Sequence, residues 1–183
     1  YVDRAKRLFE RDKNHACVFM WSLGNESGVG KNHAEMQKYI KSRDKDALVH
    51  YERATATQNV YRDMPDIYSE MYSHPDFCRD YLKDKKQTRP LYLCEYVHAM
   101  GNGPGSVKEY VELIRNNDKF LGGCVWEMTD HSVEITLPDG RHGYTYGGDF
   151  GDFPNDGCFC VDGLVYPDRR PHTGFLEVKK AYQ

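Results

Sequence analysis

PLYLCEY (residues 90–96), followed after one residue by the glycine-rich loop HAMGNGPGS (98–106), is the stretch that decides the fold. A short, continuous apolar run of this kind is typical of a strand buried on both faces of a parallel sheet. Two further runs have the same character, ACVFMWSL (16–23) and FLGGCVWEMTD (120–130). We interpret all three as buried strands that lead into loops.

The segments between these runs return to helical spacing, and short strands alternating with helices predict a parallel α/β architecture with right-handed crossovers. Residues 131–183 are rich in Gly, Asp, Pro and Tyr and show little periodicity. No repeat or linker interrupts the chain, so we expect one continuous domain over 1–183. The remaining expected elements are helices at 1–13, 32–43, 75–84 and 107–117, strands at 47–54 and 66–72, and a hairpin at 136–145.

Composition narrows the class of protein. The chain has 183 residues, 39% hydrophobic and 29% charged, with a formal net charge of −3. Its basic residues are scattered and no run reaches the ~20 apolar residues of a membrane helix, so neither nucleic acid nor a membrane is an expected partner. The first residues, YVDRAKRLFERDKN, are amphipathic and charged, unlike a secretory signal.

The six cysteines contain no CxxC pair, and Cys17, Cys94 and Cys124 lie within apolar runs. Such cysteines are usually small buried hydrophobes, so we expect thiols rather than disulfides or structural zinc. The eight histidines show no zinc-type pair on one helix face. A reducing compartment fits this usage, and we expect a cytoplasmic protein.

Three strand exits are candidates for chemistry: Asn25-Glu26, Glu95-Tyr96 and Trp126-Glu127. Parallel α/β sheets bind ligands at the carboxyl ends of their strands. A carboxylate directly after an apolar run costs free energy unless it is paired, hydrogen-bonded or bound to metal. Three interpretations fit Glu26 and Glu95. Glu26 suits a helix N-terminus and Glu95 a buried ion pair, or both suit a metal site. They also suit glycoside hydrolysis, in which the two carboxyl groups of a retaining enzyme lie about 5–5.5 Å apart. The pattern alone leaves these alternatives open.

Aromatic residues stand at the same exits. Tyr72, Tyr96, His98 and Trp126 suit the stacking platform that the apolar face of a sugar prefers, although each one also suits packing.

Long motifs then point to a known family. WSLGNESG (21–28) and LCEYVHAMGN (93–102) resemble the acid/base and nucleophile motifs of the β-galactosidases of glycoside hydrolase family two. The resemblance covers essentially all 183 residues, and the CEYxHAMGN run favours the galactosidase branch over the related β-glucuronidases. Its other motifs are GGCVWEMTDHS (122–132), YGGDFGD (146–152) and GLVYPDRRPH (163–172).

The resemblance implies a role for each matching residue. Glu26 corresponds to the acid/base and Glu95 to the nucleophile that forms the galactosyl-enzyme. Asn25 corresponds to a residue that hydrogen-bonds the sugar near its 2-hydroxyl, and Tyr72 to a tyrosine close to the nucleophile. His98 corresponds to a substrate-binding histidine, and Trp126 to the sugar platform.

The resemblance also implies two cations. Glu26 corresponds to a ligand of the active-site magnesium, whose other protein ligands, a glutamate and a histidine, belong to a part of the family domain outside this chain. The main-chain carbonyl of Phe159 corresponds to a ligand of a monovalent cation, typically sodium. The next sodium ligand in the family pattern is an asparagine, and this sequence has Asp162 there.

The family fold is an eight-stranded (β/α) TIM barrel, with the acid/base after strand four and the nucleophile after strand seven. The resemblance places strands four to eight in this chain, so we expect an α/β fold that is an incomplete (β/α)8 barrel. A complete barrel typically needs about 250 residues. Five parallel strands leave two open sheet edges, which favour self-association.

The leading hypothesis is a retaining β-galactosidase domain that acts by double displacement within a parent polypeptide, with the isolated chain inactive. Its expected partners are a β-galactoside and the remainder of that polypeptide. The alternative is a non-catalytic carbohydrate-binding or interaction module derived from the same barrel.

Overall fold

The computed structural model describes all residues, 1–183, and divides the chain into two compact units. The first unit comprises Tyr1–Cys94 with Asn117–Gly122, and the second comprises Glu95–Asn116 with Gly123–Gln183. The boundaries fall inside two strands, β4 (Leu91–Tyr96) and β5 (Phe120–Val125), which therefore contribute residues to both units.

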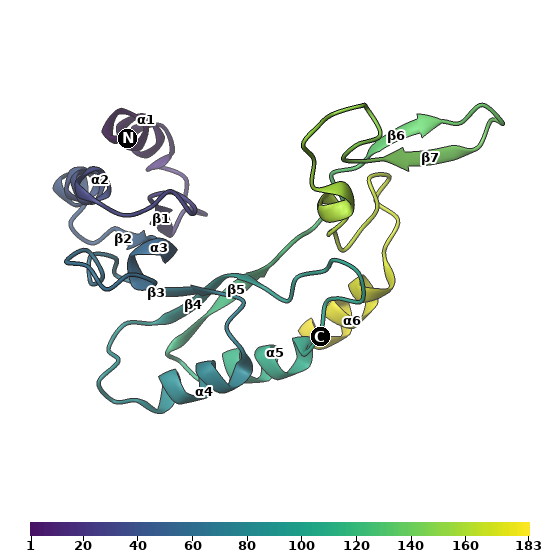
Figure 1. Cartoon of the computed structure of the whole chain (residues 1–183). Helices are drawn as coiled ribbons and strands as arrows, with labels where there is room; N and C mark the ends of the chain where they lie inside the picture. The colour runs from purple at the N-terminus through teal and green to yellow at the C-terminus, as the bar shows by residue number, and fades with distance from the viewer. The chain divides into compact units, whose positions relative to one another are not determined.

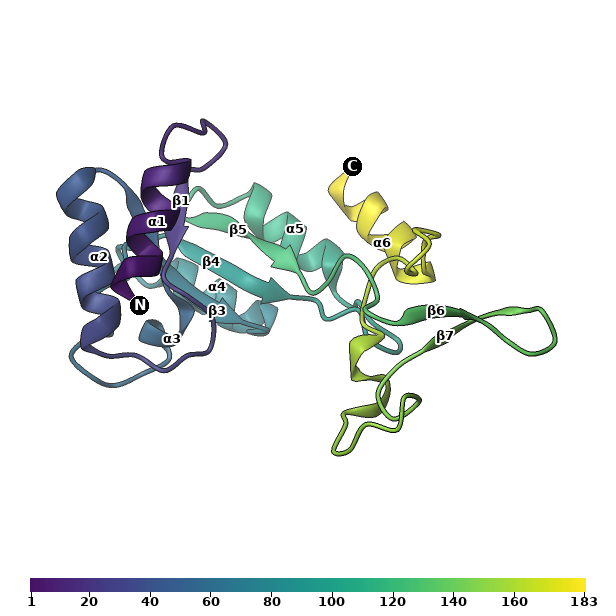
Figure 2. The ribbon, with the colours of Figure 1, turned by 90° about the horizontal axis from the view of Figure 1, so that it is seen from above.

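The first unit alternates helices and short strands, as the sequence predicts. The elements before β4 are α1 (Val2–Asp12), β1 (Met20–Ser22), α2 (Lys31–Arg43), β2 (Leu48–His50), α3 (Glu52–Thr55), β3 (Tyr68–Met71) and α4 (Pro75–Lys83). The parallel pair β1–β2 places Trp21 opposite Val49. The helices α1 and α2 lie side by side next to this pair (Figures 1 and 2), and the rings of Phe9 and Trp21 meet at 4.7 Å.

A three-stranded sheet, in the order β3-β4-β5, follows along the chain. The Leu91 N–H donates to Lys119 C=O where β4 and β5 begin, and the Trp126 N–H donates to Tyr96 C=O where they end. Bonds that join start to start and end to end make these strands parallel, and Figure 2 shows the two arrows running the same way. Leu91 and Leu93 are fully buried, as expected of a central strand.

Five strands thus stand in the five places where the sequence predicts them, and they form a two-stranded and a three-stranded sheet rather than a closed barrel. The fold class, a partial α/β barrel, is confirmed.

The second unit combines a helical pair with irregular chain. The helix α5 (Val107–Arg115) packs against α6 (Thr173–Tyr182), where Arg115 Nη2 donates to the Tyr182 carbonyl at 2.7 Å. The expected hairpin is present as β6 (Val133–Thr136) and β7 (His142–Thr145), and a short 3-10 helix, η1, spans Gly157–Cys160.

The structure corrects three expectations. The strand expected at 47–54 ends at His50, and Glu52–Thr55 form the short helix α3.

The helix α6 was not predicted, because Gly174 lies near its start and none of its residues is fully buried, which leaves a weak apolar pattern. The expected burial of the cysteines in apolar runs is also wrong for Cys17 and Cys124, which are exposed. Cys17 precedes β1 instead of lying within it, and Cys124 occupies an exposed position of β5.

Cys78, in α4, is the buried cysteine, and burial raises the pKa of its thiol to about 11. None of the six cysteines forms a disulfide. No helix of the structure combines the length and the apolar character needed to cross a membrane.

Candidate active site

The predicted site residues fall in both units, and each unit builds its own part. The first unit holds Asn25, Glu26 and Tyr72. The second unit holds Glu95, His98, Trp126, Phe159 and Asp162.

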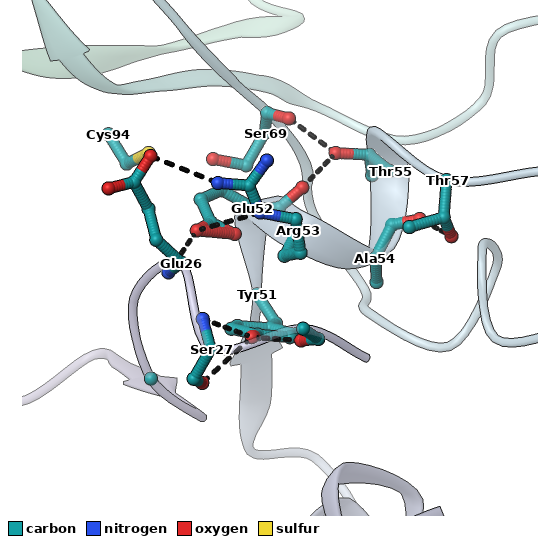
Figure 3. A network of polar contacts seen from close by, with 12 residues as sticks. Glu26, Ser27, Tyr51, Glu52, Arg53, Ala54, Thr55, Thr57, Ser69 and Cys94 are labelled. Atoms are coloured by element: carbon teal, nitrogen blue, oxygen red, sulfur yellow. Dashed lines mark hydrogen bonds and ion pairs between the residues drawn. The ribbon is translucent and has the colours of Figure 1, made fainter. Parts of the chain in front are cut away.

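Glu26 lies in the loop that leaves the carboxyl end of β1. The Leu23 N–H donates to His50 C=O and extends the pairing of β1 with β2 up to this loop. The Glu26 N–H donates to the Glu52 carboxylate at 2.6 Å, and Arg53 Nη2 lies 2.9 Å from Glu26 Oε1 (Figure 3). The Glu26 side chain remains 59% exposed, so its carboxylate is held yet reachable from solvent.

Glu26 opens onto a cleft of about 300 Å³ within the first unit. Tyr72, which follows β3, lines the same cleft, as does Glu70. Burial raises the pKa of Glu70, although hydrogen bonds from Tyr68 and Ser73 oppose the shift. The remaining lining residues are Glu52, Arg53, Ala56, Ser69 and Met71. The structure thus brings Glu26 and Tyr72 to one cleft, whereas Asn25 is exposed beside Glu26 and does not line it.

In the second unit, Trp126 and His98 lie beside one buried carboxylate, that of Asp162. Asp162 is only 3% exposed, and its Oδ2 accepts a hydrogen bond from Trp126 Nε1 at 3.1 Å. His98 Nε2 lies 4.0 Å from the same oxygen, and the His98 ring lies 6.0 Å from that of Phe159. Glu95, half-buried near the end of β4, precedes His98 along the same strand and loop.

The resemblance implies a sodium site and a magnesium site, and the residues of this chain fit only the first. Asp162 Oδ1 is buried and has no hydrogen-bond partner. A buried carboxylate oxygen without a donor is costly, and an oxygen-binding cation would satisfy it, so Asp162 fits a sodium ligand. No group of three or more His, Cys, Asp or Glu side chains converges to hold a metal, so Glu26 does not form a magnesium site with residues of this chain.

The whole chain, residues 1–183, matches the family model described as "Glycosyl hydrolases family 2, TIM barrel domain". The chain belongs to this family. It is 42% identical to a "Beta-galactosidase" of Vibrio cholerae, over 100% of this chain and 19% of the relative, and 42% identical to that of Staphylococcus xylosus, with the same shares. The chain therefore spans about a fifth of the length of these curated relatives.

Solved structures show the same family fold. A glycosyl hydrolase family 2 member from Bacteroides cellulosilyticus superposes with a TM-score of 0.65 over 99% of this chain and 22% of that chain. Its identity is 15%, so this likeness supports the fold alone.

Three residues beside the candidate site were given no role from the sequence. Glu52 and Arg53 contact Glu26, but both fall inside the strand expected at 47–54, whereas the structure ends that strand at His50 and places them in α3. Glu127 was noted at a strand exit but given no role. Burial and the negative charges of Asp162 and Glu95 raise its pKa, while His131, 3.2 Å away, opposes the shift.

Gly103 gives a prediction for the loop that carries His98. A Cβ added at Gly103 would lie 2.0 Å from the His98 carbonyl oxygen, so the loop must shift to accept any side chain. We expect Gly103→Ala to lower the free energy of unfolding by about 1–3 kcal/mol, because a side chain forced into a packed site displaces its neighbours. Gly105→Ala is the matched control, since nothing lies within 4 Å of its added Cβ. Equal thermal stabilities of the two variants would contradict this prediction.

Proposed function

We propose that this chain is part of the catalytic barrel of a retaining β-galactosidase that hydrolyses terminal β-D-galactosides. One observation carries the proposal. In a chain of family 2, Glu26 stands in the loop after β1 and Glu95 near the carboxyl end of β4, and each of these strands has a parallel neighbour. This end of the strands bears the active site in barrel enzymes. The β-galactosidase names of the relatives support the choice of sugar.

The proposed reaction proceeds in two displacements. The Glu95 carboxylate attacks the anomeric carbon while Glu26 protonates the departing glycosidic oxygen, which leaves a galactosyl-enzyme ester on Glu95. Glu26, now ionised, takes a proton from water as that water attacks the same carbon and releases Glu95. Each displacement inverts the carbon, so the product keeps the β configuration.

Four further residues are proposed to bind the sugar. We assign Asn25 to the region of the 2-hydroxyl, where contacts strengthen as the oxocarbenium-like transition state develops. His98 is assigned to a sugar hydroxyl and Trp126 to the stacking platform. The hydrogen bond from the Trp126 indole to Asp162 supports the last assignment, because it fixes the ring plane. Tyr72 is assigned a substrate-binding role from its place in the cleft beside Glu26.

Two cations are proposed, and they differ in whether this chain supplies their ligands. Sodium would be held by the Phe159 carbonyl and by Asp162, whose unpaired buried oxygen supports the assignment. A bound monovalent cation there would offer a positive charge to galactose hydroxyls. Magnesium, with Glu26 as one ligand, is proposed only for the parent enzyme, with its other ligands from outside this chain. We further propose a cytoplasmic location, from the cysteine usage.

We expect the isolated 183-residue chain to be inactive, since it contributes five strands and no closed barrel. Open strand edges also favour pairing between copies, so self-association should accompany the loss. A chromogenic galactoside and size-exclusion chromatography measure the two effects. Vigorous turnover by the pure chain would contradict this expectation.

The stereochemistry of hydrolysis tests the proposed function. Proton NMR of the parent enzyme's reaction with an aryl β-galactoside should show β-galactose as the first product, before it equilibrates in water. An initial α product would exclude the double displacement, and absence of turnover of any β-galactoside would exclude the activity.

A further inference from the structure

Three consecutive residues, Tyr51, Glu52 and Arg53, each hold a different part of the loop that carries Glu26 (Figure 3). We propose that they position Glu26 for its chemistry, with Glu52 as the principal positioning residue. This inference rests on the proposed acid/base role of Glu26 and adds residues to it that neither the motifs nor the comparisons assign.

The first contact fixes the backbone of Glu26. Its φ is +48°, in the left-handed region that residues with a Cβ rarely adopt. Such a conformation persists only where the surroundings determine it. The Glu52 carboxylate supplies this constraint by accepting the Glu26 N–H at 2.6 Å, and an ionised acceptor makes the hydrogen bond stronger. Glu52 is only 4% exposed, so water competes little for the contact.

The second contact fixes the side chain of Glu26. Arg53 Nη2 binds Oε1 at 2.9 Å, and Arg53 Nε lies 4.0 Å from Glu52 Oε1, so the guanidinium bridges the two carboxylates. Arg53 engages one oxygen of Glu26 and leaves Oε2 for proton transfer. Because Arg53 is 37% exposed and Glu26 59%, solvent weakens this contact, and Glu52 is the stronger constraint.

The third contact fixes the residues after Glu26. The buried Tyr51 hydroxyl accepts the Ser27 N–H at 3.2 Å, lies 3.0 Å from Ser27 Oγ, and donates to the Gly28 carbonyl. The Tyr51 ring stacks on His33 with centroids 4.4 Å apart and planes at 13°. The tyrosine therefore anchors the loop to a packed part of the first unit.

The helix α3, which carries Glu52 and Arg53, is itself hydrogen-bonded to a strand. Thr55 Oγ1, at the end of α3, donates to the Ser69 carbonyl in β3 and lies 2.8 Å from the Glu52 carbonyl (Figure 3). The residues that hold Glu26 thus stand on an element that is itself fixed to the sheet.

The test separates positioning from general stability. In the parent polypeptide, kcat/KM reports the step that forms the galactosyl-enzyme, and only a poor leaving group needs protonation in that step. We expect Glu52→Ala to lower kcat/KM for phenyl galactoside by about thirtyfold or more, but for dinitrophenyl galactoside by less than about threefold. Glu52→Gln keeps an acceptor oxygen and should recover most of the lost rate, and Arg53→Ala should show the same pattern more weakly.

Asp66→Ala is the matched control. The Asp66 carboxylate also accepts a backbone N–H, that of Val49 at 2.8 Å, and it pairs with Lys41 at 2.8 Å, but it has no contact with Glu26. The Asp66→Ala variant should lose thermal stability and keep the wild-type ratio of the kcat/KM values for the two substrates. Equal losses for both leaving groups in Glu52→Ala, or no loss, would overturn the positioning role.

A Glu26→Ala variant, measured with the same two substrates, distinguishes the acid/base role of Glu26 from the positioning role of Glu52. If Glu26→Ala discriminates between the leaving groups and Glu52→Ala does not, the positioning role fails while the acid/base role stands. If Glu26→Ala does not discriminate either, the acid/base assignment fails, and the positioning role fails with it.

Discussion

Replacing Glu95 with Gln in the parent polypeptide is expected to lower kcat/KM for every β-galactoside by at least about a thousandfold, the scale of losing an essential catalytic group. The amide of glutamine does not attack the anomeric carbon, and no other carboxylate is proposed to form the ester. The loss should be the same for good and poor leaving groups, because the missing bond is needed for both. Steady-state kinetics with both substrate types measure it.

The control for this variant is Glu112→Gln on α5, also in the second unit. Glu112 is 59% exposed and pairs only with Lys108 at 3.7 Å, so its replacement should leave the rate unchanged. Substantial turnover by the Glu95→Gln enzyme, relative to this control, would assign the nucleophile to another residue.

Glu26→Ala should produce a different pattern. We expect kcat/KM for phenyl galactoside to fall by about a hundredfold or more, the usual contribution of a general acid, and that for dinitrophenyl galactoside to change little. The second step also needs Glu26, as base, so the galactosyl-enzyme should accumulate with the activated substrate. Azide should restore turnover, because this small anion attacks the anomeric carbon without a base and forms β-galactosyl azide.

Glu35→Ala controls for removal of an exposed carboxylate from the first unit. Glu35 is 47% exposed on α2 and pairs with Lys38 at 4.0 Å, so neither substrate should be affected. If azide gave no galactosyl azide with the Glu26→Ala enzyme, or gave the α product, the acid/base assignment would be wrong.

The strands of this fold were predictable because burial on both faces leaves a continuous apolar run. PLYLCEY shows this most clearly: Leu91 and Leu93 are fully buried, and Glu95 follows them near the strand end. The same reasoning failed for α6, where the helix buries none of its residues completely and its apolar pattern is weak.

The sequence names candidate site residues, but it does not predict the contacts between them. The Glu26–Glu52 hydrogen bond joins residues 26 positions apart, and it depends on the parallel register that sets Ser22 opposite His50. Nothing in HYER (50–53) specifies that register, and the sequence predicts only that these residues continue the strand expected at 47–54. The indole hydrogen bond from Trp126 to Asp162 likewise depends on how the irregular chain after β7 returns to the end of β5.

The central claim is that Glu95 carries the sugar in a covalent intermediate, and peptide mapping of the trapped enzyme tests it most directly. The parent enzyme is inactivated with a fluorinated galactoside, digested and analysed by mass spectrometry. The account predicts a single galactosyl ester on Glu95 within PLYLCEY and none in the Glu95→Gln variant. A label on another carboxylate, such as Glu127 or Glu70, or its persistence in the variant, would contradict it.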